Sequence, residues 1–238
     1  MRTLLFPPQC ICCRTLLPPF DGSDSVFCPL CRTAWETALA EAAERSSQDA
    51  SRGMVYLTYY RSDRPANAPE RLIHCLKHRK DPRAFRFVAR CLAPRVLDAA
   101  ERIPARAPSP DADRRLLFTY PPRRRSARRR NGLDQASCLA KALARSCGGE
   151  YATLIRRTRR PSGEQKWLGA DGRMQNATDT YVLVPSAAET VRGRMVVICD
   201  DLRTTGATLD RCACLLVEAG ARSVILATVA KTYFSREK

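Results

Sequence analysis

Residues 195–229 constrain the fold of this chain most, because they read in order as a strand, a polar turn, a helix and a second strand. Val196 to Cys199 are apolar without alternation, which is typical of a strand buried on both faces of a parallel sheet. Apolar residues then recur every three or four positions from Leu209 to Gly220, and a glycine there predicts the end of a helix. A further apolar run, Val224 to Val229, completes a βαβ unit with a right-handed crossover. We therefore expect an α/β fold with helices on both faces of a parallel sheet.

Two acids and a turn rich in threonine follow the first of these strands. Asp200 and Asp201 are expected at its carboxyl end, where open α/β sheets bind ligands and where carboxylates can accept hydrogen bonds from vicinal hydroxyls. The next residues offer hydroxyl groups, a closely approachable backbone and the amides of a helix start, which together bind anions. They are Thr204, Thr205, Gly206, Ala207 and Thr208. The order predicts a site for a phosphorylated sugar, and the alternative is an ordinary loop with a helix cap.

Length and charge set the outer limits of the interpretation. A chain of 238 residues can hold one main α/β core and a small appendage. Lys and Arg total 41 against 24 Asp and Glu, a net charge of +17, so the protein should attract phosphate-rich ligands. This charge does not distinguish a small phosphate ester from a nucleic acid. Because no signal peptide or long apolar run is found, we expect no membrane span and a cytoplasmic protein.

Two Cys-x-x-Cys pairs near the amino terminus predict a metal site. Cys10 and Cys13 form one pair, and Cys28 and Cys31 form the other. Four thiolates at this spacing suit a structural zinc ion in a zinc ribbon, whereas two disulfides are the alternative reading. Cys12 is a spare thiol that could compete as a ligand. We expect residues 1–50 to form this double-knuckle module with a linker helix, and residues 51–238 to form the α/β domain.

The remaining elements follow from periodicity and from breaks at polar residues, glycine or proline. We expect helices at 35–44, on either side of Asp81-Pro82, and at 136–147, and strands at 54–60 and 116–120. A break is expected at 46–53. The cysteines outside the amino-terminal pairs lie in apolar stretches, where a small buried residue is the usual role. They are Cys75, Cys91, Cys138, Cys147, Cys199, Cys212 and Cys214.

Arginines are concentrated directly after the strand expected at 116–120. Six of the eight residues from Arg123 to Arg130 are arginine. Such runs are usually solvated, but guanidinium groups at the ligand edge of a sheet suit a pyrophosphate. Single-stranded DNA could use the same arginines, although no aromatic residue is interleaved for base stacking. We interpret His78 and Arg79 as a solvated helix end and residues 158–180 as a lid.

Taken in order, these pieces resemble the ComF-like phosphoribosyltransferase family, which is associated with competence for DNA uptake, over nearly the whole chain. The matches are the cysteines Cys10, Cys13, Cys28 and Cys31, the element Leu72, Ile73 and Lys77, the residues Gln165, Arg173 and Asn176, and the intact loop from Asp200 to Thr208. The segment 131–135 matches only in part: Asn131 stands where arginine is typical, and Asp134 replaces asparagine.

The resemblance implies a type I phosphoribosyltransferase fold that binds PRPP, 5-phosphoribosyl 1-pyrophosphate, together with Mg²⁺. Asp200 and Asp201 would then hold the ribose hydroxyls, the turn at 204–208 the 5-phosphate, and Arg123 and Lys77 would complete the site. The implied activity is transfer of phosphoribosyl to a nitrogen acceptor that the sequence does not name. The alternatives are a non-catalytic sensor of PRPP or a nucleotide that contacts single-stranded DNA or a DNA-uptake ATPase, and a zinc-ribbon nucleic-acid binder with the α/β domain as scaffold.

Overall fold

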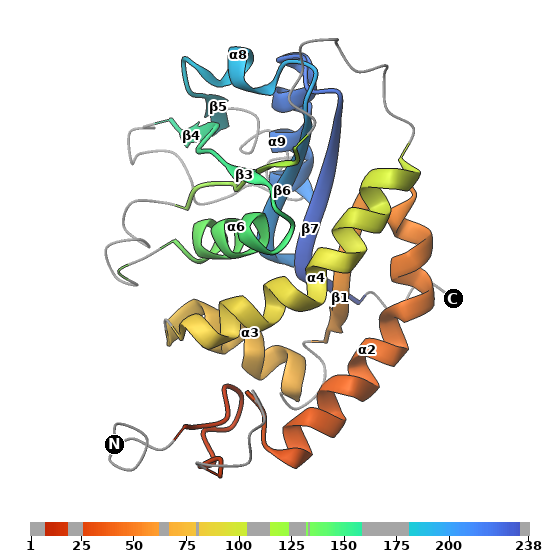
Figure 1. Cartoon of the computed structure of the whole chain (residues 1–238), viewed down its shortest axis with the longest axis vertical. Helices are drawn as coiled ribbons and strands as arrows, with labels where there is room; N and C mark the ends of the chain where they lie inside the picture. The colour runs from red at the N-terminus through yellow and green to blue at the C-terminus, as the bar shows by residue number, and fades with distance from the viewer. Residues whose placement is uncertain are drawn as a thin grey trace, which may run out of the picture.

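A five-stranded parallel sheet forms the centre of the molecule (Figure 1), with the strand order β1-β7-β6-β2-β3. The computed structural model describes residues 8–18, 26–61, 67–79, 81–103, 115–123, 132, 134–158 and 181–233. The strands of this sheet are β1 Met54–Tyr60, β2 Leu117–Thr119, β3 Glu150–Tyr151, β6 Met195–Arg203 and β7 Ser223–Thr232. A separate antiparallel pair consists of β4 Ile155–Arg157 and β5 Tyr181–Leu183. The predicted parallel sheet flanked by helices is confirmed.

Helices cover both faces of the sheet. They are α2 Pro29–Ala50, α3 Ala68–His78, α4 Pro82–Arg102, α6 Gln135–Ser146, α8 Ala187–Val191 and α9 Ala207–Glu218. The buried cluster on one face joins α2, α3, α4 and α6 to strand residues such as Phe118, Val197 and Cys199. The cluster on the other face joins α8 and α9 to Leu117, Val196 and Ile198. Because successive strand residues point to opposite faces, the uniformly apolar β6 serves both clusters.

The direction of the chain through the sheet reverses between β6 and β2. From β6 the chain continues through α9 to β7 on one side, and from β2 it continues through α6 to β3 on the other. Two right-handed crossovers that move in opposite directions put their helices on opposite faces, which agrees with α6 and α9 lying in different clusters. Ligands of open parallel sheets bind beside the carboxyl ends of the strands at such a reversal.

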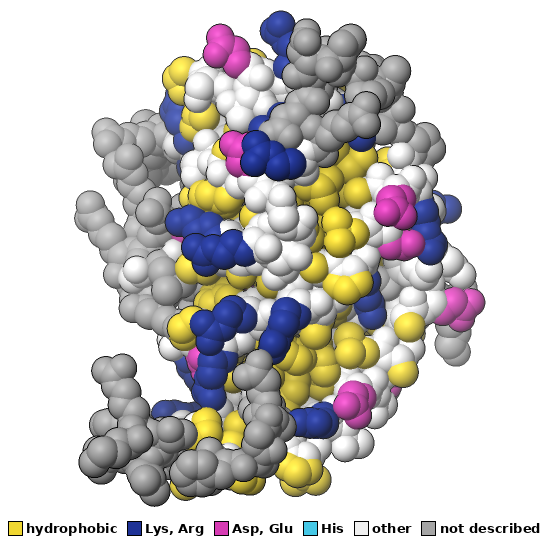
Figure 2. All heavy atoms as spheres, viewed as in Figure 1, with side chains coloured by type: hydrophobic (Ala, Val, Ile, Leu, Met, Phe, Trp, Pro, Cys, Tyr) yellow, Lys and Arg dark blue, Asp and Glu magenta, His cyan; other side chains and the backbone are white. Residues whose placement is uncertain are grey.

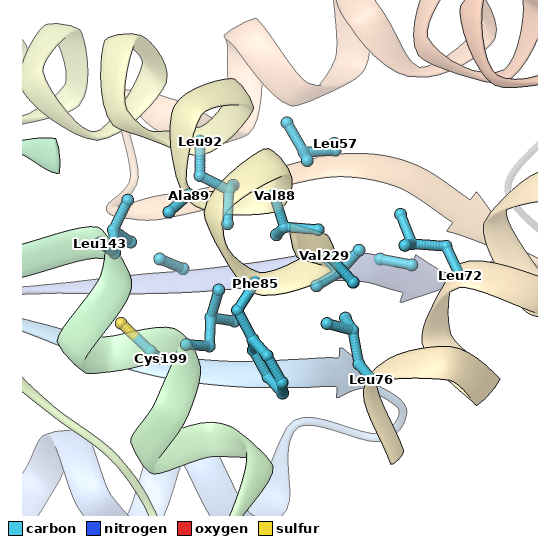
Figure 3. Packing of buried hydrophobic residues seen from close by; sticks show 14 of the residues in the cluster. Leu57, Leu72, Leu76, Phe85, Val88, Ala89, Leu92, Leu143, Cys199 and Val229 are labelled. Atoms are coloured by element: carbon cyan, nitrogen blue, oxygen red, sulfur yellow. The ribbon is translucent and has the colours of Figure 1, made fainter. Parts of the chain in front are cut away.

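The larger cluster is packed around α4 (Figure 3). Phe85, Val88 and Leu92 on α4 face Val229 of the sheet, while Leu143 of α6 and Leu76 of α3 close the sides. These residues are almost completely buried. Their spacing of three and four positions along α4 is the amphipathic pattern expected of a helix that lies on a sheet. The packing fixes α3 and α6 beside the carboxyl ends of β2 and β6.

The amino-terminal module packs against the same cluster. Phe27 precedes the second cysteine pair, and its ring centroid lies 5.9 Å from that of Trp35 on α2 and 4.8 Å from that of Phe87 on α4. Trp35 and Phe87 are themselves 5.6 Å apart. Edge-on aromatic contacts at these distances are favourable beyond their buried area. The residues expected as two parts therefore share one buried cluster, and the division at residue 50 stays a prediction.

Several local expectations need correction. The helix expected at 35–44 runs from Pro29 to Ala50, so the expected break starts only at Ser51. Two buried polar residues in the last turns of this helix, Ser46 and Asp49, explain why it extends beyond residue 44. Ser46 donates a hydrogen bond to the Tyr56 carbonyl (2.6 Å), and Asp49 accepts one from the Tyr56 hydroxyl (3.2 Å). Polar residues that signal a loop in sequence are thus satisfied by β1.

The cysteines outside the metal-site pairs also differ from one another. Cys75, Cys199 and Cys212 are buried as expected, Cys91, Cys138 and Cys147 are half-buried, and Cys214 is exposed, which corrects its assignment to the core. All twelve cysteines of the chain are free thiols. Among the helices that the structure describes, none combines the length and the hydropathy needed to cross a membrane.

The turn between α6 and β3 offers a test of the packing. Gly148 has a φ of +63°, and a Cβ there would meet nothing within 4 Å, whereas a Cβ on Gly149 would lie 2.5 Å from the Phe118 ring and 2.6 Å from the Leu116 carbonyl oxygen. We expect Gly149→Ala to cost about 3 kcal/mol of unfolding free energy through overpacking. Gly148→Ala should cost about 1 kcal/mol through its left-handed backbone alone. Urea unfolding of both variants measures the difference, and an equal or reversed order would contradict this packing.

Candidate functional site

Asp200 and Asp201 lie in the last part of β6, beyond the end of its neighbour β2. The pairing of β6 with β2 stops at Ile198, opposite Thr119. The pairing with β7 continues through Asp200, opposite Thr228, to Arg203, opposite Lys231. The acids therefore belong to the strand rather than follow it, which corrects the expected strand end. They still reach the edge of the sheet at the reversal between β6 and β2, because β2 is short.

Asp201 is the point at which two cations from distant parts of the chain meet. Its Oδ2 atom lies 3.2 Å from Lys77 Nζ at the end of α3 and 3.2 Å from Arg123 Nη2 in the segment after β2. The Asp201 side chain is 7% exposed, and the two cations are each about one quarter exposed. A nearly buried carboxylate needs paired charges. The structure thus brings together three of the residues that the sequence predicts for the ligand site.

Two residues at the start of α6 form hydrogen bonds with the backbones of both cations. The buried Asp134 accepts a hydrogen bond from the Arg123 backbone N–H through Oδ2 (3.2 Å). Gln135 Nε2 donates to the Lys77 carbonyl oxygen (2.7 Å). The other side-chain oxygens, Asp134 Oδ1 and Gln135 Oε1, are buried and find no hydrogen-bond partner among the described residues. In the sequence, Asp134 and Gln135 stand out only as part of the 131–135 resemblance, and no local pattern indicates that they support Lys77 and Arg123.

Asp200 has a different environment because it alternates with Asp201 along the strand. Its Oδ1 atom accepts a hydrogen bond from the Asp201 backbone N–H (2.8 Å). Burial raises the pKa of Asp200 well above its usual value, and the negative charge of Asp201 raises it further. Arg123 is the nearby cation that opposes this shift. The site therefore combines an Asp201 that is paired with two cations and an Asp200 whose raised pKa favours its protonated form.

The turn after β6 leads directly into α9. Thr204 and Thr205 are exposed, Gly206 is buried with a φ of +86°, and α9 begins at Ala207. No side chain caps this helix. The first amide groups of a helix have no partner within it and carry its positive dipole end, so they can bind an anion. Gly206 is required here, because a side-chain residue strongly disfavours this left-handed conformation.

Arg157 and Tyr181, which the sequence did not single out as a pair, lie close to this turn. Arg157 Nη1 donates to the Tyr181 hydroxyl (2.9 Å), and the guanidinium lies 4.9 Å from the ring centre. Burial raises the pKa of Tyr181, whereas Arg157 and the Thr208 hydroxyl oppose this shift. Arg157 and Tyr181 are opposite each other in the pairing of β4 with β5. Because β5 contacts α9, this pair lies beside the helix that follows the turn.

The four paired cysteines come together as predicted. The Sγ atoms of Cys10, Cys13, Cys28 and Cys31 all lie within 4.8 Å of one another. Tetrahedral zinc with Zn–S bonds of about 2.3 Å separates its sulfur ligands by about 3.8 Å, so the cluster fits a metal such as zinc. Cys12 stands apart, and its Sγ contacts the Ala68 carbonyl oxygen at 3.4 Å. Within the described residues this is the one group of three or more such ligands.

Two arginines connect this cysteine cluster to the helices beside the acids. Arg79 Nη1 donates to the carbonyl oxygens of Ile11 (3.2 Å) and Cys12 (3.3 Å). Arg83 Nη2 donates to the Gln9 carbonyl oxygen (2.9 Å) and pairs with Asp81 (2.8 Å). Arg79 is thus not only the solvated helix end that the sequence indicated. It ties the first knuckle to the end of α3, two residues after Lys77.

Other predicted positions lie outside the described residues. These are Arg124 to Arg130, Asn131, and the lid residues from 159 to 180, which include Gln165, Arg173 and Asn176. The expected role of the arginine run therefore rests on Arg123 as far as the structure describes it. The expected lid joins β4 to β5 along the chain, and β5 contacts α9.

Comparison with known proteins gives one family match. Residues 131–237 match the family model described as a phosphoribosyl transferase domain. No curated protein matches the chain. The matched segment contains the acids of β6, the turn and α9, and it excludes the cysteine cluster, Lys77 and Arg123.

Solved structures with some similarity include a glutamine PRPP amidotransferase from B. subtilis, with 17% identity and a TM-score of 0.37 over 76% of this chain. This chain covers only 30% of that protein. A hypoxanthine phosphoribosyltransferase from Trypanosoma cruzi has 12% identity and a TM-score of 0.38, covering 63% of this chain and 64% of that one. TT1426 from Thermus thermophilus has 20% identity and a TM-score of 0.32, covering 68% and 86%. Residues 131–237 are therefore similar to a phosphoribosyl transferase domain, and they include β3, β6 and β7 of the parallel sheet.

Proposed function

We propose that this protein binds PRPP at the reversal between β6 and β2 and transfers its phosphoribosyl group to a nitrogen acceptor. The observation that carries the proposal is the meeting of Lys77 and Arg123 on Asp201, directly before a glycine turn that opens α9. Asp200 and Asp201 would accept hydrogen bonds from the ribose hydroxyls. The turn at 204–208 would hold the 5-phosphate, and Lys77 and Arg123 the pyrophosphate.

The proposed reaction is substitution at C1 of the ribose. The bond from C1 to the pyrophosphate oxygen breaks, pyrophosphate leaves with the electron pair, and the lone pair of an incoming nitrogen forms the new bond to C1. Cations beside the leaving group lower the barrier, because they stabilise the negative charge that develops on it. Lys77 and Arg123 are suited to this role because Asp134 and Gln135 already fix their backbones. The acceptor stays unnamed.

Magnesium would bind with the substrate rather than in a protein cage. Asp201 is already paired with two cations and Asp200 favours protonation, so the described acids do not offer a separate cluster of carboxylates. Mg²⁺ is often held through substrate phosphates and few protein groups. Bound in that way, it would neutralise charge on the pyrophosphate. We propose zinc for the cysteine cluster, as a structural ion in a cytoplasmic protein whose thiols are free.

A second candidate function rests on the charge of the surface. Lys and Arg side chains gather over α3, α4 and α6 in Figure 2, whereas acidic side chains lie mainly toward α2. A basic face of this kind attracts polyanions at low salt. The alternative is a non-catalytic PRPP or nucleotide sensor of the ComF type that contacts single-stranded DNA or an uptake ATPase. Salt-sensitive DNA binding that persists in Asp201→Asn, without pyrophosphate release for any acceptor, would favour this alternative.

Asp201→Asn tests the proposed ligand site. Calorimetric titration of the wild-type protein with PRPP and Mg²⁺ should show binding, and the variant should lose about tenfold to a hundredfold in affinity, as expected for lost hydrogen bonds to a charged group. The affinity for pyrophosphate alone should not fall in the same way, because the substitution frees Lys77 and Arg123 from their ion pairs. Equal PRPP affinity in the two proteins would refute the assigned role of Asp201.

Asp200→Asn tests the environment of the second acid through stability. A carboxyl group whose pKa is raised in the folded state stabilises the fold below its unfolded pKa, and this contribution is lost as the pH rises through the folded value. At about neutral pH the wild type must either bury a charged Asp200 or protonate it, and both cost free energy of folding. We therefore expect the variant to have a higher melting temperature than the wild type at this pH. The difference should shrink as the pH falls toward about 4. A variant that melts lower at neutral pH would contradict the raised pKa.

The metal content of the cysteine cluster is directly measurable. Purified protein should contain about one zinc per chain, and the double variant Cys28→Ser, Cys31→Ser should lose it with a clear fall in melting temperature. Cys12→Ser should keep the metal, because Cys12 Sγ contacts Ala68 rather than the cluster. The exposed Cys214→Ser serves as the matched control. Zinc loss in Cys12→Ser would place Cys12 among the ligands.

A further inference from the structure

Arg203 is a cation directly before the proposed phosphate turn at 204–208. It is the last residue of β6 and stands between the two acids and the two threonines. Its side chain folds back over the turn, because a Cβ placed on Gly206 would meet the Arg203 guanidinium and the Asp210 carboxylate at once. This cover explains why Gly206 is buried although both threonines before it are exposed.

Within the described part of the chain, Asp210 is the one side chain that holds the guanidinium, so part of its hydrogen-bonding capacity is unused there. Arg203 Nη2 lies 3.2 Å from Asp210 Oδ1 and 3.1 Å from Asp210 Oδ2. Arg203 Nε is buried and has no hydrogen-bond partner among the residues that the structure describes. A guanidinium has five donors, and a buried donor without an acceptor is unfavourable. The guanidinium lies beside Gly206, the N-cap of α9, and the first amides of a helix have no partner within it.

We propose that Arg203 is a ligand of the 5-phosphate, and that Asp210 occupies its guanidinium while the site is empty. This inference rests on the proposed function, because it assigns one more residue to the same ligand. Arginine binds phosphate with two parallel charge-assisted hydrogen bonds, which are stronger than an exposed ion pair with one carboxylate. The Asp210 side chain is half exposed, so water can take over its hydrogen bonds when the arginine moves to the ligand.

Asp210 thereby sets the affinity of the turn for phosphate. It competes with the ligand for Arg203, and its negative charge in the first turn of α9 repels a phosphate at the same helix end. The two residues should therefore have opposite effects when they are changed one at a time. An ion pair that only braced the turn would give the same effect for both changes, since removing either partner breaks it.

The experiment compares the affinity for ribose 5-phosphate in Arg203→Gln, Asp210→Asn and the wild type by calorimetry. Arg203→Gln should bind about tenfold to a hundredfold more weakly, whereas Asp210→Asn should bind several-fold more tightly. Arg145→Gln is the matched control. It removes the same charge from an exposed position in the last turn of α6. This end of the helix lies at the sheet edge opposite the ligand site, so the affinity should stay unchanged. Melting temperatures verify that each variant is folded.

Pyrophosphate alone provides a second readout. Its affinity should not change in Arg203→Gln, because pyrophosphate is assigned to Lys77 and Arg123. Weaker binding of ribose 5-phosphate in both Arg203→Gln and Asp210→Asn, or unchanged binding in Arg203→Gln, would overturn the role of Arg203 and leave the proposed function intact. A wild-type protein that binds neither ribose 5-phosphate nor PRPP would overturn the proposed function as well.

Discussion

The pairing of Asp201 with Lys77 and Arg123 is the interaction on which the candidate site depends. Each partner comes from a different element: α3, the segment after β2, and β6. A carboxylate this deeply buried is tolerated only because two cations compensate it. The same cations are thereby held at the sheet edge, where a phosphorylated ligand could replace the carboxylate as their partner. The site is therefore organised by charges that a ligand would use.

The reversal of strand order explains why these elements meet. Because β2 ends at Thr119 while β6 continues to Arg203, the end of β6 has no neighbour on that side. Lys77 and Arg123 reach Asp201 there, and the start of α6 supports both through Asp134 and Gln135. The cysteine cluster supports this site indirectly. Arg79, which follows Lys77 by two residues, donates hydrogen bonds to the backbone of the first cysteine pair. A structural metal would thus stabilise one wall of the site.

A carboxylate that forms ion pairs with cations lies at each end of the proposed ligand. Asp201 holds the cations assigned to pyrophosphate, and Asp210 holds the cation assigned to the 5-phosphate. In a chain with a net charge of +17, such pairing limits the repulsion between cations when no anion is bound. It also makes selectivity possible, because a ligand must offer anions at both ends to replace both carboxylates. A ligand with a single phosphate would satisfy only one of them.

The sequence by itself determined the parallel sheet, the glycine turn before α9 and the cysteine cluster, because each depends on local periodicity or on fixed ligand spacing. It indicated Asp201, Lys77 and Arg123 separately, through a resemblance and their neighbours along the chain. Only the tertiary structure decided that the three meet, that Asp134 and Gln135 support them, and that Ser46 and Asp49 belong to a helix. These contacts join residues from 7 to 124 positions apart along the chain. The physical reason is that an ion pair or buried hydrogen bond depends on distance in space, which a linear pattern does not encode.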